Sequence, residues 1–231
     1  NIFGDSIAQQ QSGAIAKTFI SNVFTFMLMA LAISGLVAYF IGSDRELIET
    51  IWSSNIKWVV MLAPLGLVFL MAGRFQKMSA QTLLIVFLVY SVLMGLSLSV
   101  IVAVYSPMAI VKTLGITAAT FGTMAVLGYT TKTDLSKMGT YLMMALIGII
   151  IASVVNWFVG SSQLDYLISI GGVIIFTGLT AYDMQKIKRI GSSLDSYDNN
   201  ASKLAIMGAL NLYLDFVNLF LFLLRIFGGR D

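Results

Sequence analysis

One long apolar run near the C-terminus, Leu204 to Phe227, carries an acidic residue close to its middle. As a helix rising ~1.5 Å per residue, this run would be roughly 36 Å long, which is enough to cross a lipid bilayer with some tilt. The acidic residue is Asp215, and a carboxylate at that depth costs about 2.5–3.5 kcal/mol, so it needs a partner, a proton or a water-filled cavity. Such a helix must turn its acid toward other protein, which predicts a position near the centre of a helical bundle.

Other polar residues of the same run accompany the acid at helical spacing. Residues spaced four, three, four and three apart share one face of a helix. This predicted face holds Asn211, Asp215, Asn218, Phe222 and Arg225. The alternative interpretation of Asp215 is a structural carboxylate satisfied by such polar neighbours. Arg225 lies ~15 Å along the helix from Asp215, which is too far for pairing. We therefore expect Arg225 to anchor at the outer interface or to bind Glu46 or Glu49.

The composition extends the membrane interpretation to the whole chain. Of 231 residues, 58% are hydrophobic and only 11% are charged, against about 25% charged in ordinary soluble domains. We predict an all-α protein with seven transmembrane helices in a single integral membrane domain over residues 1–231. The predicted spans are 19–41, 56–72, 82–105, 109–129, 138–159, 166–183 and 204–227. Residues 1–18 are predicted to be a polar tail, and residues 184–203 the longest polar loop.

Charges and missing residue types narrow the function classes. The side that holds the N-terminus has nine Lys and Arg and the other side has five, so the positive-inside rule predicts a cytoplasmic N-terminus and an external C-terminus. The chain has no cysteine and no histidine, which removes thiolate sites, the commonest metal ligand and the usual general base. It has no nucleotide-binding or hydrolase motif, and the GxGD motif of intramembrane aspartyl proteases is missing. We expect neither an enzyme nor a resident cofactor, and the small net charge gives no case for nucleic acid as a partner.

A second acid, Asp183, ends the sixth predicted span just before a basic run. Thr177, Thr180 and Asp183 follow each other at intervals of three and form a polar stripe that can face the stripe around Asp215. Two carboxylates at hydrogen-bonding distance in a low dielectric do not both ionise, so the pair would share a proton. That arrangement would sense protons without histidine. The alternative is that Asp183 reaches the cytoplasmic surface, where nearby lysines solvate it.

The second span carries two further candidates. Pro64 lies inside it, which predicts a kink, a hinge and a backbone carbonyl that has lost its donor. Arg74 follows the span on the same predicted side as Asp183, and an arginine offers a carboxylate two parallel hydrogen bonds. Arg74 is therefore a candidate latch for Asp183, and otherwise a charge that sets membrane topology.

Two motifs carry a resemblance to a known family. The stretch TGLTAYDMQKIKR, followed by GALNLYLDFVNLFLFLLRIFGGR, resembles the C-terminal third of the Bax inhibitor-1 family, and the segment from Arg74 through VYSVLMGLSLSVI resembles its second and third helices. The resemblance implies a seven-helix bundle whose last helix is enclosed by the other six, and a pH-dependent calcium leak with a two-aspartate sensor. Matched by motif, the sensor residues are Asp183 and Asp215, the latch is Arg74, and the late arginine is Arg225.

The residues and the resemblance together lead to one expected function and one alternative. We expect a pH-sensitive cation leak of the bacterial inner membrane, with Ca²⁺ bound weakly by Asp183 and Asp215 and with Thr180 among the supporting polar groups. Its partners would be the lipid bilayer, Ca²⁺ and protons. The alternative is a regulator of a membrane-bound ATP-dependent protease or of a stress response, acting through residues 1–17 and 184–203.

Overall fold

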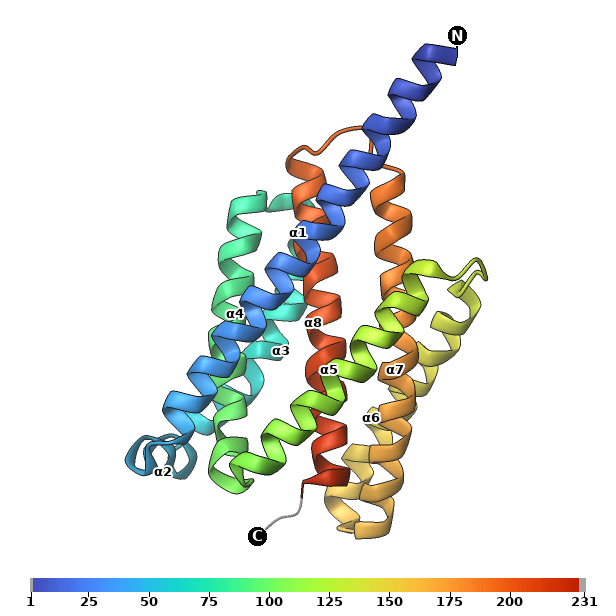
Figure 1. The fold of residues 1–231 in the computed structure, drawn as a ribbon. Helices are drawn as coiled ribbons and strands as arrows, with labels where there is room; N and C mark the ends of the chain where they lie inside the picture. The colour runs from blue at the N-terminus through green and yellow to red at the C-terminus, as the bar shows by residue number, and fades with distance from the viewer. Residues whose placement is uncertain (1, 229–231) are drawn as a thin grey trace. The chain divides into compact units, whose positions relative to one another are not determined.

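The computed structural model describes residues 2–228, with side chains from residue 13 onward. Every regular element in this range is helical. The elements are α1 (Ile2–Gly42), α2 (Arg45–Ser53), α3 (Ile56–Arg74), the 3-10 turn η1 (Phe75–Lys77), α4 (Ala80–Val104), α5 (Pro107–Thr130), α6 (Ser136–Val159), α7 (Ser162–Ser192) and α8 (Asn199–Phe227). All of the α-helices except α2 are long and apolar enough to cross a membrane. The predicted all-α class with seven spans is confirmed (Figure 1).

The helices group into two compact units. The first unit comprises residues 1–104 and 190–213, and the second comprises residues 105–189 and 214–231. Helix α8 contributes its first half to the first unit and its second half to the second unit. Whether the chain is one integral membrane domain, as the sequence predicts, stays a prediction.

Helix α4 is the central partner within the first unit, because both α1 and α3 pack against it (Figure 1). An aromatic cluster fills part of this core. Tyr213 of α8 stands edge-on to Phe87 and Tyr90 of α4. The Tyr213 hydroxyl is 2.7 Å from Oγ of Ser34 in α1, and Ser34 in turn donates to the backbone oxygen of Ser91. A buried hydroxyl that has partners avoids the cost of an unmade hydrogen bond inside the membrane.

Small residues bring the helices of the second unit together. A Cβ added to Gly128 of α5 would collide with the backbone oxygen of Ala181 in α7. A Cβ added to Gly139 of α6 would lie 2.5 Å from the ring of Tyr182, also in α7. Glycines at contacts of this kind let backbones approach closely where lipid supplies no hydrophobic driving force. Both α5 and α6 therefore rest closely on the segment of α7 that leads into Asp183.

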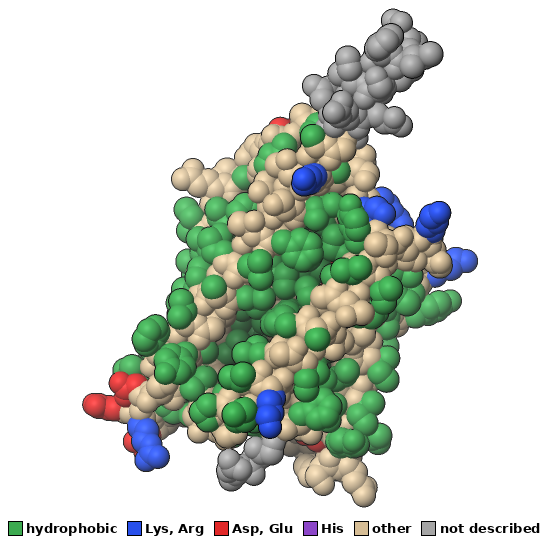
Figure 2. All heavy atoms as spheres, in the orientation of Figure 1, with side chains coloured by type: hydrophobic (Ala, Val, Ile, Leu, Met, Phe, Trp, Pro, Cys, Tyr) green, Lys and Arg blue, Asp and Glu red, His purple; other side chains and the backbone are tan. Residues whose placement is uncertain are grey.

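Burial along the chain follows the predicted role of the last span. In the most apolar stretch of α8, 61% of the residues are buried, the largest share among the seven spans. In the corresponding stretch of α6, none is buried. Figure 2 shows hydrophobic side chains along the helices and charged side chains near their ends. This distribution suits a chain that faces lipid along its spans.

The predicted loop at 184–203 is wrong. Helix α7 continues to Ser192 and α8 begins at Asn199, which leaves only residues 193–198 between them. The helix extends this far because two apolar residues within the polar stretch lie at helical spacing. Met184 and Ile187 are three residues apart, and both are buried. The neighbouring polar side chains bind backbone and side chains of the loop that joins α5 to α6.

Two other polar segments are also helical. The stretch predicted as a polar tail belongs to α1, which runs without a break from Ile2 into the first span. The polar segment after α1 contains the short helix α2, whose N-terminus is capped by Asp44 through the N–H groups of Glu46 and Leu47. An aspartate at this position satisfies donors that the first helical turn leaves free.

Candidate functional site: an aspartate pair between two spans

The structure brings Asp183 of α7 and Asp215 of α8 together within the second unit. Their carboxyl groups lie close enough to interact directly with each other. Asp215 is only 4% exposed, and Asp183 is half-buried. An ionised carboxylate can only accept hydrogen bonds, so a bond between two carboxyl groups requires a proton on one of them. The pair is therefore a protonatable unit between two membrane-spanning helices.

The surroundings of the pair leave one oxygen available. Oδ2 of Asp215 is buried, and no N–H or O–H donor among the described residues reaches it. Lys186 lies three residues beyond Asp183 on α7 and exerts an attractive charge on its carboxylate. Lys186 itself is exposed. The aspartate pair therefore has one oxygen, Oδ2 of Asp215, without a protein donor among the described residues, and a positive charge, Lys186, on its exposed side.

The polar residues expected to support the pair bind elsewhere. Thr180 Oγ1 donates to the backbone oxygen of Phe176 at 2.7 Å, and Asn218 Nδ2 donates to the backbone oxygen of Leu214 at 2.8 Å. Each bond closes on the residue's own helix, four positions earlier, so these side chains satisfy themselves locally. Asn211 is half-buried and belongs to the first unit. These residues do share a face of their helix, but the hydrogen bonds of Thr180 and Asn218 do not link that face to the carboxyl groups.

Arg225 binds an acid that the sequence did not single out. Its Nη1 is 3.8 Å from Oδ1 of Asp165 in the first turn of α7, and its guanidinium lies 5.4 Å from the centre of the Phe222 ring. The acid that the structure places at Arg225 is thus Asp165, whereas the sequence suggested Glu46 or Glu49. No local sequence pattern points to Asp165, because its proximity to Arg225 depends on α7 and α8 running antiparallel. The pair is about half exposed, and such ion pairs contribute little stability.

Arg74 and Pro64 both lie in α3, in the first unit. Arg74 is the last residue of the helix and is exposed. Asp183 belongs to the second unit, so the latch between them stays a prediction. Helix α3 is continuous through Pro64, which is buried. The ring nitrogen of a proline has no hydrogen, so the backbone oxygen four residues earlier, that of Val60, loses its helical donor. Ser97 Oγ of α4 donates to this oxygen, which confirms the predicted free carbonyl and shows what satisfies it.

A set of polar contacts missed by the sequence reasoning holds the loop at residues 131–135. Gln185 of α7 accepts from the N–H of Leu135 at 2.9 Å through Oε1, and it donates to the backbone oxygen of Thr133 at 2.8 Å through Nε2. A single amide therefore satisfies both a donor and an acceptor of the loop backbone. The sequence signal for these contacts was the helical spacing of the buried Met184 and Ile187, between which Gln185 lies.

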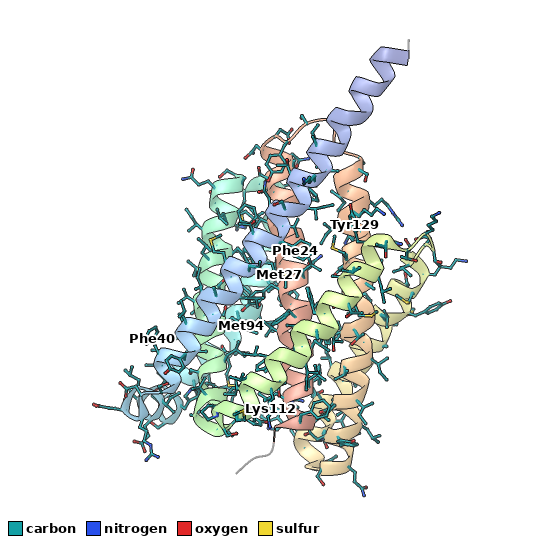
Figure 3. The ribbon with its side chains drawn as sticks, in the orientation of Figure 1. Phe24, Met27, Phe40, Met94, Lys112 and Tyr129 are labelled. Atoms are coloured by element: carbon teal, nitrogen blue, oxygen red, sulfur yellow. The ribbon has the colours of Figure 1, made fainter. Side chains whose placement is uncertain are left out.

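The next turn of α7 adds charged contacts to the same loop. Arg189 donates to Asp134 at 2.9 Å and to Ser136 Oγ at 3.2 Å. Lys188 donates to the backbone oxygen of Tyr129 at 2.6 Å, and its Nζ lies 4.8 Å from the centre of that ring (Figure 3 labels Tyr129 at the end of α5). Hydrogen bonds from Ser136, assisted by Arg189, lower the pKa of Asp134 to about 2. The loop is thus fixed to α7 within the two turns that follow Asp183.

The seven long apolar helices define a polytopic α-helical membrane protein. The chain belongs to the Bax inhibitor-1 family, because the family model described as "Inhibitor of apoptosis-promoting Bax1" matches residues 16–231. It is 46% identical over 227 residues to an uncharacterized protein of Borreliella burgdorferi, with 98% of each chain covered. It is 43% identical over 228 residues to the inner membrane protein YbhL of Escherichia coli, covering 98% of this chain and 97% of the relative. The family predicted from the two motifs is confirmed.

Proposed function

We propose that this protein is a non-enzymatic, pH-sensitive leak for Ca²⁺ in the bacterial inner membrane, with Asp183 and Asp215 as its proton sensor. The observation that carries the proposal is the close approach of the two carboxyl groups, with Asp215 buried. Acidic residues inside membrane spans are costly, and those that persist mark ion pathways and proton relays. A carboxyl pair placed between α7 and α8 fits that role.

The sign of the pH response follows from the charge on the pair. When the shared proton is lost, Asp183 carries a full charge and can engage the Arg74 guanidinium, which keeps the cytoplasmic end of α3 closed. When the pair is protonated, that attraction weakens and α3 is free to move about Pro64. Acidification therefore opens the leak and alkalinity closes it.

The same carboxyl groups supply the oxygen ligands that Ca²⁺ prefers. Oδ2 of Asp215 has no protein donor among the described residues, which leaves its lone pairs available to a cation. Two carboxylates give far fewer than the six to eight oxygens of a tight calcium site. Weak binding suits passage rather than storage, and Ca²⁺ and protons compete for the same oxygens.

The test is calcium flux into liposomes that contain the purified protein, at pH 6 and pH 8. The variants are Asp183→Asn and Asp215→Asn, since an amide can still bond to the remaining carboxylate but cannot titrate. Asp195→Asn is the matched control, because Asp195 is exposed in the 193–198 loop. We expect faster flux at pH 6 in the unmodified protein and the control, and no pH dependence in the two sensor variants.

Two outcomes would overturn the proposal. A pH dependence that survives in both sensor variants would remove the carboxyl pair as the sensor. The absence of flux at either pH, in folded protein, would remove the leak itself. It would favour the alternative function, regulation of a membrane protease or stress response through protein contacts.

A further inference from the structure

A lysine at the start of α8 is buried. Lys203 is 8% exposed. Lysine is almost never buried unless a partner compensates its charge. Its Nζ donates to the backbone oxygen of Gln76 at 3.4 Å and lies 4.8 Å from the centre of the Phe75 ring. Both partners belong to η1, the turn that directly follows Arg74.

The chemistry of this contact explains why a lysine is placed there. The last carbonyls of a helix have no donors within the helix and carry partial negative charge, so a cation is favourable beside them. The face of an aromatic ring attracts the same cation. Neither ion pair found among the described residues includes Lys203. Its charge therefore rests on a carbonyl and a ring, whose hold is weaker than that of a carboxylate.

A second contact holds the other side of the same turn. Asn199, one helical turn before Lys203, accepts a hydrogen bond from the N–H of Ala80 through Oδ1 at 3.3 Å. Ala80 is the first residue of α4. The start of α8 thus contacts both sides of the α3–α4 turn: Lys203 binds the turn just after α3, and Asn199 binds the first residue of α4. All of these residues lie in the first unit.

We propose that Lys203 is a positioning residue that holds the C-terminal end of α3, and with it Arg74, in the closed state of the leak. Lys203 acts on Arg74 through the two residues that follow it, Phe75 and Gln76. Release of the ammonium from this turn frees the end of α3, while the bond of Ser97 still holds the helix at Val60. This inference rests on the proposed leak function but makes a structural claim of its own.

The structural claim is tested by a distance measurement that needs no flux. Because the chain has no cysteine, spin labels can be attached at Ala72→Cys and Asn200→Cys, two exposed positions of the first unit. Pulsed electron resonance then gives the distance distribution between α3 and α8 in liposomes. We expect a narrow distribution with Lys203 and a broader, longer one with Lys203→Met, which keeps the apolar stem and loses the charge. Lys203→Arg should restore the narrow distribution.

The matched control is Lys77→Met, which removes the same charge from an exposed position of the same turn. It should leave the distance distribution unchanged. If Lys203→Met does not fold, Phe75→Leu removes the ring from beneath the ammonium while keeping an apolar side chain, and it should broaden the distribution in the same way. An unchanged distribution in a folded Lys203→Met or Phe75→Leu protein overturns the proposal.

Flux measurements separate the failure of this inference from the failure of the leak. We expect Lys203→Met to raise calcium flux at pH 8 several-fold, toward the value of the unmodified protein at pH 6, and Lys77→Met to leave it unchanged. A pH-dependent flux that Lys203→Met does not alter overturns the gating role of Lys203 and leaves the leak standing. A distance change without flux in any protein overturns the leak and keeps Lys203 as the residue that positions the end of α3.

Discussion

Two connecting segments of this protein are held by later helices, but with different chemistry. In the second unit, α7 holds the α5–α6 loop through the two-way amide of Gln185 and the ion pair between Arg189 and Asp134. In the first unit, α8 holds the α3–α4 turn through Lys203 on a carbonyl and Asn199 on one N–H. Both arrangements satisfy one backbone donor and one backbone acceptor. The first does so with shorter bonds and adds an ion pair, whereas the second has only two longer bonds and the contact of Lys203 with the Phe75 ring. A loop held in the first way resists displacement, whereas a turn held in the second way can be released.

The largest expected difference in stability is between substitutions of the glycines that precede the two segments. Gly128 meets the Ala181 backbone directly, whereas a Cβ at Gly73 would meet nothing within 4 Å. We expect Gly128→Ala to lower the free energy of unfolding by about 3 kcal/mol, since a backbone contact cannot yield as a side chain does. Gly73→Ala should be neutral or stabilising by up to ~1 kcal/mol. Unfolding in detergent measures the free energy of unfolding of both variants. Equal losses of that free energy would show that the ends of α3 and α5 are packed alike, against this prediction.

A smaller effect compares the amides that hold the two segments. Gln185→Ala leaves a donor and an acceptor of the loop without partners, so it should cost about 2 kcal/mol, and Asn199→Ala should cost about 1 kcal/mol. Hydrogen exchange followed by mass spectrometry should show faster exchange confined to residues 131–135 in the first variant and to residues 75–80 in the second. Faster exchange throughout both units would contradict the assignment of each amide to one segment.

A third comparison concerns the hinge within α3. Ser97→Ala leaves the Val60 carbonyl without a donor and should cost about 1 kcal/mol. Pro64→Ala restores the helical donor to the same carbonyl. In the double variant, Ser97→Ala should therefore cost less than it does alone, which a double-mutant cycle of unfolding free energies measures. Strict additivity would show that Ser97 does not compensate for the proline.

The smallest effect concerns pH and the α5–α6 loop. The pKa of Asp134 is lowered to about 2, first by hydrogen bonds from Ser136 and then by Arg189. A lowered carboxyl pKa gives stability that is present above the usual value of about 4 and is lost as pH falls through the lowered value. Protection factors of residues 131–135 should therefore not change between pH 8 and pH 5. A loss of protection within that window would show that another group controls the loop.

The parts of this fold that sequence predicts are those encoded over a few consecutive turns. Long apolar runs placed the spans, because bilayer thickness fixes their length. The spacing of polar residues around Asp183 and Asp215 predicted that two helices would turn these acids toward each other. Proline chemistry alone predicted the free carbonyl at Val60, although not the residue that satisfies it.

The parts that sequence reasoning missed depend on which helices become neighbours. Arg225 binds Asp165 because the end of α8 meets the start of α7, and no local pattern selects that acid over Glu46 or Glu49. The extension of α7 was hidden because its polar residues suggested a loop, although the spacing of Met184 and Ile187 carried a helical signal. The role of Lys203 could not be predicted, since nothing near it in the chain reveals the carbonyl of Gln76.

The division of α8 between the two units has a consequence for biosynthesis. Each unit contains part of this helix, and α8 leaves the ribosome after the other six spans, since chains are made from the N-terminus. While the earlier six spans enter the membrane, the hydroxyl of Ser34 lacks Tyr213 and the carboxyl of Asp183 lacks Asp215. Neither half can mature ahead of the other, so a nascent chain stopped before residue 199 remains unfinished in both halves at once.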